Sequence, residues 1–244
     1  MDTTKQFDRT KEDVGNVQLL EHVNVTVPDQ GLASMFYVTG LGFTRDPYID
    51  FGTFNMWVNL GDQQFHLPVS DPQVLRGHIG VVVPELEGLM KRLNFASKAL
   101  TETSFTYKEN GNQVELTCPY GNTLRAFESG AFPSMDLGMP YVQLDVPQGT
   151  KQGIANFYST VIGCPATVHS DSAHISMGHN QELIYTETDK PLPEYDGHHI
   201  AVYVSDFSGP HKWLADRDLI SEESDQYQYR FEKIVDPDSG EILY

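Results

Sequence analysis

The chain has 244 residues, enough for one large core or for two cores of about 100–150 residues each. Its 34 acidic and 16 basic residues give a net charge of -18, which repels polyanions and argues against nucleic acid or an anionic membrane as a partner. The sequence contains no run of about 18 apolar residues, so it predicts no membrane-spanning helix. The polar start of the chain lacks the apolar segment of a secretion signal. Two cysteines, Cys118 and Cys164, suggest no disulfide framework, so we expect a cytoplasmic protein.

A strand-like opening recurs four times along the chain, at intervals of about 60 residues. Its copies are Leu20–Pro28, Arg76–Pro84, Pro140–Pro147 and Gly197–Ser205. When the copies are aligned on their last residue, one equivalent position is occupied by His22, His78, Tyr141 and His199. A repeat of this length predicts a supersecondary unit that occurs four times.

Each copy opens a unit of one strand, one helix and three further strands. In the first unit, Asp29 is a candidate N-cap, and the predicted elements are a helix over 32–38 and strands over 43–49, 54–60 and 63–68. The second unit has a strand over 78–83, an amphipathic helix over 86–94 and strands over 103–107, 113–118 and 123–127. Residues 129–138 are a predicted linker. The third unit has a helix over 154–163 between short strands, and the fourth ends in a strand that reaches Tyr244.

These units resemble the modules of the vicinal oxygen chelate (VOC) superfamily, which includes glyoxalase I, the extradiol dioxygenases and the bleomycin resistance proteins. The resemblance covers about residues 19–244, and its best local marks are Phe36–Phe43, Cys118–Asn122 and Asp236–Gly240. It implies an α+β fold of four βαβββ modules that form two tandem glyoxalase-like half-barrel domains. The expected organisation is a mobile tail at 1–18, a domain with a metal-binding cup at 19–130, and a second domain, without metal, at 139–244.

The resemblance also places metal ligands on the first and last strand of each module. In the first domain these positions hold His22, His78 and, on the last strand of module one, His66. Because strand residues alternate between faces, Phe65 and Leu67 should face the helix while His66 faces the cup. The resemblance implies a divalent metal such as Fe, Zn, Ni or Mn, and imidazole nitrogens suit such ions. Alternatively, these histidines have a structural role only. His199 illustrates this alternative, because it occupies the same first-strand position in a module that has no visible partner ligands.

The last-strand position of module two, where this superfamily usually has Glu, holds Arg125. Alternation sends Arg125 into the cup and Glu128 to the outside. On the preceding strand, Glu115 resembles a cup-facing position of the dioxygenases. We therefore predict Glu115 as the catalytic base and Arg125 as the group that binds an anionic substrate. Alternatively, Glu115 pairs with Arg125 across the strands, or Glu115 or Glu128 completes a 2-His-1-carboxylate metal site.

Two functions remain open from the sequence. The first is a glyoxalase- or dioxygenase-like enzyme that acts on a small, anionic, oxygen-rich metabolite, with lyase or isomerase chemistry if the metal is redox-inert and dioxygenase chemistry if it is iron. The second is a metal-free protein of the bleomycin-resistance type that binds or sequesters a small molecule. In both cases the partner is a small molecule, and the protein is a monomer with both halves in one chain or a homodimer.

Overall fold

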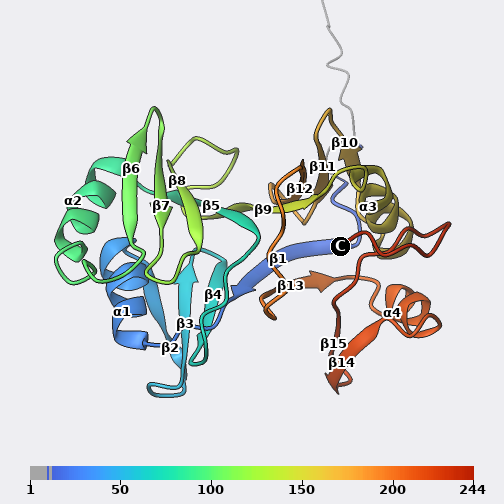
Figure 1. The fold of residues 1–244 in the computed structure, drawn as a ribbon, viewed down its shortest axis with the longest axis horizontal. Helices are drawn as coiled ribbons and strands as arrows, with labels where there is room; N and C mark the ends of the chain where they lie inside the picture. Colours follow the sequence, from blue (N-terminus) through green and yellow to red (C-terminus); the bar gives the residue numbers. More distant parts are fainter. Residues whose placement is uncertain (1–9, 11–12) are drawn as a thin grey trace, which may run out of the picture.

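The described residues, 10 and 13–244 of the computed structural model, form four successive modules built on the order strand, helix, three strands, the last of them incomplete (Figure 1). The strands are β1 (Val17–Asn24), β2 (Thr44–Asp50), β3 (Asn55–Leu60), β4 (Gln63–Pro68), β5 (Gly77–Val83), β6 (Thr106–Asn110), β7 (Gln113–Thr117), β8 (Thr123–Glu128), β9 (Gly138–Pro147), β10 (Ala166–Val168), β11 (Ser172–Ser176), β12 (Glu182–Thr188), β13 (His199–Val204), β14 (Ile220–Asp225) and β15 (Gln228–Phe231). The helices are α1 (Gln30–Ser34) with its π-helical continuation η2 (Met35–Gly40), α2 (Leu86–Ala96), α3 (Lys151–Phe157) with its π-helical continuation η3 (Tyr158–Ile162), and α4 (Ser208–Ala215). The predicted α+β modular fold is confirmed.

Each of the two large sheets is shared by two modules. The five-stranded sheet has the order β13-β1-β4-β3-β2, and the eight-stranded sheet has the order β10-β11-β12-β9-β5-β8-β7-β6. The first strand of module one, β1, pairs antiparallel with β13 of module four, and β5 of module two pairs antiparallel with β9 of module three. In Figure 1, α1 and α2 lie at one end of the molecule and α3 and α4 at the other, while each sheet runs between the two ends.

This pairing differs from the metal cup predicted within residues 19–130. Modules one and two pack together through α2 and η2, whereas their first strands lie in different sheets. The physical reason is that each first strand pairs on one edge with the last strand of its own module and has a second edge that needs another partner. The hydrophobic pattern of a strand does not encode which module provides that partner. The boundaries 19–130 and 139–244 remain predictions for the two halves.

The last two residues of the predicted tail at 1–18 belong to strand β1. Residues 1–9 and 11–12 lie outside the described residues. Of the remainder, Asn16 is held by its side chain, whose amide donates to the carbonyl oxygens of Ile162 (2.8 Å) and Asp206 (2.9 Å). Strand β1 begins directly afterwards, at Val17.

Alternating apolar residues bind each helix to one side of its sheet. In β4, Phe65 and Leu67 are fully buried, and the Phe65 ring lies 4.9 Å from the ring of Tyr37 in η2. The predicted N-cap of the helix that carries Tyr37 is confirmed, because the Asp29 carboxylate accepts a hydrogen bond from the Leu32 amide at 2.9 Å, and the helix begins at Gln30, two residues before the predicted range. The opposite side of the sheet is left for the polar residues of the same strands.

Carboxylates on two last strands hold the first turns of two helices. In module two, Glu128 accepts a hydrogen bond from the amide of Leu86, the first residue of α2, at 3.2 Å. In module three, Glu187 accepts from the amide of Lys151, the first residue of α3, at 3.0 Å and from the Lys151 ammonium at 2.6 Å. Glu128 therefore faces the helix side of its sheet, as the alternation predicts, and is not available to the other side.

The fourth module lacks the predicted last strand. Only an isolated bridge joins Val235 to Ile242. Between them, the Asp236 carboxylate accepts hydrogen bonds from the amides of Asp238 (3.0 Å) and Ser239 (2.8 Å), which turns the chain back on itself. The chain after this turn therefore pairs with residue 234 rather than along β13.

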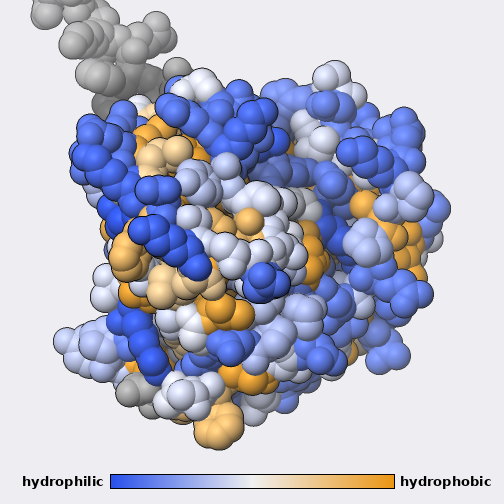
Figure 2. Space-filling view, turned by 60° about the vertical axis from the view of Figure 1, so that its left-hand side comes forward, coloured by the Kyte–Doolittle hydropathy of each residue, from blue (hydrophilic) through white to orange (hydrophobic). Residues whose placement is uncertain are grey.

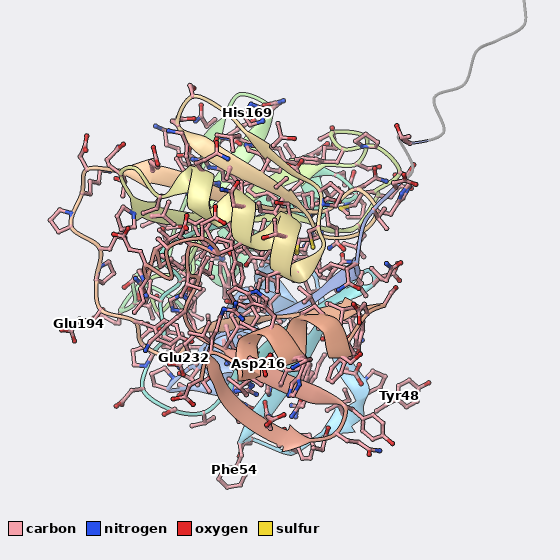
Figure 3. The ribbon with its side chains drawn as sticks, turned by 90° about the vertical axis from the view of Figure 1, so that its right-hand side faces the viewer. Tyr48, Phe54, His169, Glu194, Asp216 and Glu232 are labelled. Atoms are coloured by element: carbon pink, nitrogen blue, oxygen red, sulfur yellow. The ribbon has the colours of Figure 1, made fainter. Side chains whose placement is uncertain are left out.

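Hydrophilic residues cover most of the face shown in Figure 2, and hydrophobic ones form scattered patches. Two exposed aromatic residues project into solvent, Tyr48 from β2 at 94% exposure and Phe54 from the segment that joins β2 and β3 at 78% (Figure 3). Among the described residues, no helix has the length and hydrophobicity that a membrane crossing requires.

Candidate functional site

The sheet faces opposite the helices carry the candidate site residues. We call the side of the five-stranded sheet that bears His22 and His66 the 1–4 face, because modules one and four form it. The corresponding side of the eight-stranded sheet, which bears His78 and Arg125, is the 2–3 face. The structure thus brings His22 and His66 together but places His78, the third predicted ligand, on the other sheet.

A different histidine, His199, joins the first two. Its ring centroid lies 6.3 Å from that of His22, which in turn lies 5.7 Å from that of His66. The strand register explains the cluster, because Asn24 of β1 is the partner of both His66 on β4 and His199 on β13. The two imidazoles therefore flank β1 at the same height, and His22, two residues before Asn24, projects from the same side.

An irregularity in β1 brings a carboxylate to His22. The register with β13 shifts between Leu20 and His22, so that two residues of β1 oppose one on the partner strand. Leu20 and Val23 consequently both point into the core, while Glu21 and His22 are both half-buried. The Glu21 carboxylate contacts His22 Nδ1. A carboxylate in this place fixes the ring orientation and leaves Nε2 as the nitrogen with a lone pair.

The other two imidazoles also have Nε2 available. His199 Nδ1 lies 3.2 Å from the carbonyl oxygen of Gly197, which can only accept, so the proton is on Nδ1. His66 Nε2 is buried and has no hydrogen-bond partner in the described residues. The His66 ring stacks on Trp57 with centroids 3.9 Å apart and planes 13° apart. An orphaned buried nitrogen beside two oriented imidazoles fits the donor set of a divalent metal.

His66 and His199 are neutral at physiological pH, the state that metal coordination requires. Burial, supported by the charges of His22, His199 and Arg230, lowers the pKa of His66 to about 3. Burial and Arg230 also lower the pKa of His199 to about 4, against the opposing hydrogen bond to Gly197. Arg230 reaches this face from β15, where it forms an ion pair with Glu222 at 3.1 Å.

The rings are close to a shared centre without converging on it. Across residues 10 and 13–244, no group of three His, Cys, Asp or Glu side chains stands ready to hold a metal ion. Three imidazoles on one tetrahedral ion have ring centroids about 5 Å apart, since the metal–nitrogen distance is about 2 Å. The observed separations of 5.7 and 6.3 Å exceed that spacing by about 1 Å, which side-chain rotation can supply.

The 2–3 face has a different composition. One row of register partners crosses it, with the order Lys108, Glu115, Arg125, Gly80, Tyr141 and Glu182. A cavity of about 510 Å³ lies beside this row, and its walls include His78, Glu115 and Arg125. The structure therefore brings the predicted base and the predicted anion-binding group together, but with His78 rather than with the other two histidines.

Within the described part of the chain, Arg125 has no ion pair, although Glu115 is its cross-strand partner. The Glu115 carboxylate instead accepts a hydrogen bond from Asn110 Nδ2 at 2.9 Å. His78 Nε2 lies 3.2 Å from the hydroxyl oxygen of Tyr141. Burial and the nearby charge of Arg125 lower the pKa of His78 to about 4. The 2–3 face thus presents the guanidinium of Arg125, without an ion pair, beside a neutral imidazole and a phenol.

The fold is similar to that of solved glyoxalase I and dioxygenase-like structures. Glyoxalase I from Zea mays superposes with a TM-score of 0.63 at 15% sequence identity, over 86% of this chain and 84% of that one. A putative dioxygenase from Bacillus subtilis superposes with a TM-score of 0.54 at 18% identity, over 83% of this chain and 75% of that one. At such identities the likeness establishes the fold. No protein-family model and no curated protein sequence matches the chain.

Three residues of the 1–4 face escaped the sequence prediction. His199 was set aside because its own module offers no partner ligands, although the repeat alignment already placed it at the position of His22. Glu21 is brought in by the strand irregularity, and Arg230 comes from the far end of the chain. Only the pairing of modules one and four connects them, and the sequence carries no signal for that pairing.

Proposed function

We propose that the protein is a metal-dependent VOC enzyme whose centre is formed by His22, His66 and His199 on the 1–4 face. The observation that supports the proposal best is that all three imidazoles have Nε2 free of hydrogen bonds in the described residues and lie on three neighbouring strands within two residues of one register position. The substrate would be a small, anionic, oxygen-rich metabolite.

The residues around the centre have distinct tasks. A divalent metal bound there would supply Lewis-acid chemistry to an oxygen of the substrate. Glu21 holds His22 in one tautomer. Trp57 stacks on His66 and limits its rotation. The positive charge of Arg230 helps to lower the pKa of His66 and of His199. The same charge would attract the anionic end of the substrate.

The donor set favours one reaction class over another. Oxygenases with non-haem iron use two histidines and one carboxylate, whereas this face offers three imidazoles, and its half-buried carboxylate, Glu21, is occupied by His22. We therefore favour lyase or isomerase chemistry with a redox-inert metal such as Zn or Ni.

Two further features support the expected setting. Both large sheets form within one chain, since β1 pairs with β13 and β5 with β9, and this favours a monomer. The thiols of Cys118 and Cys164 are free and buried, which is consistent with a reducing cytoplasm.

Elemental analysis of protein purified without a histidine tag tests the proposal. We expect about one equivalent of a transition metal per chain, which His66→Ala removes. The matched control is His78→Ala, which changes an equally half-buried first-strand histidine on the other sheet and should keep the metal. A folded wild-type protein that stays metal-free after reconstitution would instead support a metal-free binding protein, and equal loss in both variants would refute the assignment.

A further inference from the structure

The two faces place different chemistry in equivalent positions. His22 on the 1–4 face corresponds to His78 on the 2–3 face, since each occupies the same place in the first-strand repeat. His66 and Arg125 also correspond, because each is the register partner of the residue two positions after the first-strand histidine of its module. The third position holds His199 on one face and Tyr141 on the other.

The exchange of histidine for arginine removes a metal ligand and adds a fixed positive charge. A guanidinium has no lone pair to give and repels a cation, whereas it binds carboxylates with two parallel hydrogen bonds. On the same face, the nitrogen that would be a ligand, His78 Nε2, is within 3.2 Å of the Tyr141 hydroxyl. The 2–3 face is therefore organised against a metal and in favour of an anion.

A glycine makes room for the Tyr141 ring between these groups. Gly80 lies between Arg125 on β8 and Tyr141 on β9 in the same row of the sheet. The Tyr141 ring lies directly over the Gly80 backbone, and a methyl group there would collide with it. Tyr141 thus leans toward Arg125 across bare backbone, and its hydroxyl and the guanidinium are presented to the same part of the face.

We propose that the 2–3 face is a metal-free binding site for a small organic carboxylate, whose carboxylate group binds Arg125 and is oriented by the Tyr141 hydroxyl. The site is separate from the metal centre of the 1–4 face and does not depend on it. The body of the ligand occupies the cavity of about 510 Å³ along β6, β7 and β8, where Thr106, Thr117 and Thr123 form part of the wall on the same side as Arg125.

The local charges favour a ligand with few negative charges. Arg125 lies at the centre of the row, with Glu115 and then Lys108 on one side and Glu182 beyond Tyr141 on the other, so two carboxylates balance the two cations. Two carboxylates near the site repel a phosphate or a di-acid more strongly than a monocarboxylate, in a chain whose net charge is already -18.

Isothermal titration calorimetry of the full chain with benzoate and hexanoate as probes tests the site. We expect at least one of the two to bind with a dissociation constant below about 1 mM and benzamide, the neutral isostere of benzoate, to bind at least 10-fold more weakly. Arg125→Gln should weaken carboxylate binding at least 10-fold, and Arg125→Lys should restore part of it. Circular dichroism verifies that the variants are folded.

Two controls separate this site from the metal centre. Arg230→Gln removes the same side chain from the other face, and His66→Ala removes a proposed metal ligand, so both should leave carboxylate binding unchanged, as should a chelator. No binding of either carboxylate, equal binding of benzamide, or full binding in folded Arg125→Gln would each overturn the proposal. Binding that disappears with Arg230→Gln or with the chelator would assign the anion to the 1–4 face and overturn it as well. None of these results requires the metal proposal to be correct.

Discussion

His66 and Arg125 occupy the same position in two copies of one repeat, yet they give their sheets opposite preferences. Each is on the last strand of its module, and each pairs with the residue two places beyond the first-strand histidine. His66 offers an unpaired nitrogen to a cation, and Arg125 offers an unpaired cation to an anion. A duplicated fold can therefore hold two chemically distinct sites that differ at the same position.

The orienting carboxylate of the metal centre gives the first prediction. Glu21→Gln should lower metal affinity about 10- to 100-fold without abolishing binding, because His22 keeps its ring but loses the partner that fixes its tautomer. Competition with a chromogenic chelator measures the change. Glu87→Gln, which removes an exposed carboxylate from α2, is the control and should bind as the wild type does. Identical affinities in the two variants would show that Glu21 has no role at the centre.

The pH dependence of stability around His78 gives the second prediction. The groups that face His78 are Tyr141 and Asp145 from β9, Arg125 from β8 and Glu115 from β7. Its folded-state pKa, about 4, is below the ordinary value of 6.5. Its stabilising contribution is thus fully present above pH 6.5 and is lost as the pH falls toward 4. Urea unfolding should show about 1–2 kcal/mol less stability from this group at pH 5 than at pH 7.5.

The same histidine reports the charge of its neighbour. Arg125→Gln removes a charge that lowers the pKa of His78, so the NMR titration of the imidazole should move to higher pH, and the loss of stability at pH 5 should shrink. Asn110→Ala is a suitable control, because it alters the hydrogen bond to Glu115 without removing a charge. If His78 titrates at the same pH in Arg125→Gln as in the wild type, the charge of Arg125 does not act on His78.

The sequence was sufficient for everything that strand alternation decides. It predicted that Phe65 and Leu67 face the helix while His66 does not, and that Arg125 and Glu128 lie on opposite sides of β8, and the burial and contacts agree. These properties are local, because a strand with one buried face fixes the orientation of every side chain along it.

The sequence was insufficient where two modules meet. The free edges of β1 and β5 present similar backbone groups, so the partner of each is decided by how the helices pack and how the chain crosses between sheets. That choice put His199, not His78, beside His22. The shift that turns Glu21 and His22 to the same side is likewise set by the pairing with β13.

Gly80 gives the third prediction. Its backbone conformation accepts alanine, but the added methyl group would meet the Tyr141 ring. Gly80→Ala should therefore destabilise the fold by about 1–3 kcal/mol through overpacking, measured by urea unfolding, and weaken benzoate binding. In the double variant with Tyr141→Leu the clash is relieved, so the two changes should cost less together than separately. Strict additivity would mean that the ring does not lie over the glycine.

The last-strand carboxylates give the fourth prediction, because Glu128 and Glu187 perform the same task at different depths. Glu128 is exposed and binds one amide of α2, so Glu128→Ala should cost about 0.5–1 kcal/mol. The Glu187 side chain is only 3% exposed and binds both the amide and the ammonium of Lys151. Glu187→Ala leaves these two donors without their acceptor, so it should lower the free energy of unfolding by about 2–3 kcal/mol. Thermal and urea unfolding measure both. Metal content should be unchanged in each variant. Loss of the metal from Glu128→Ala would indicate that Glu128 is a metal ligand, which would contradict the separation of the two faces.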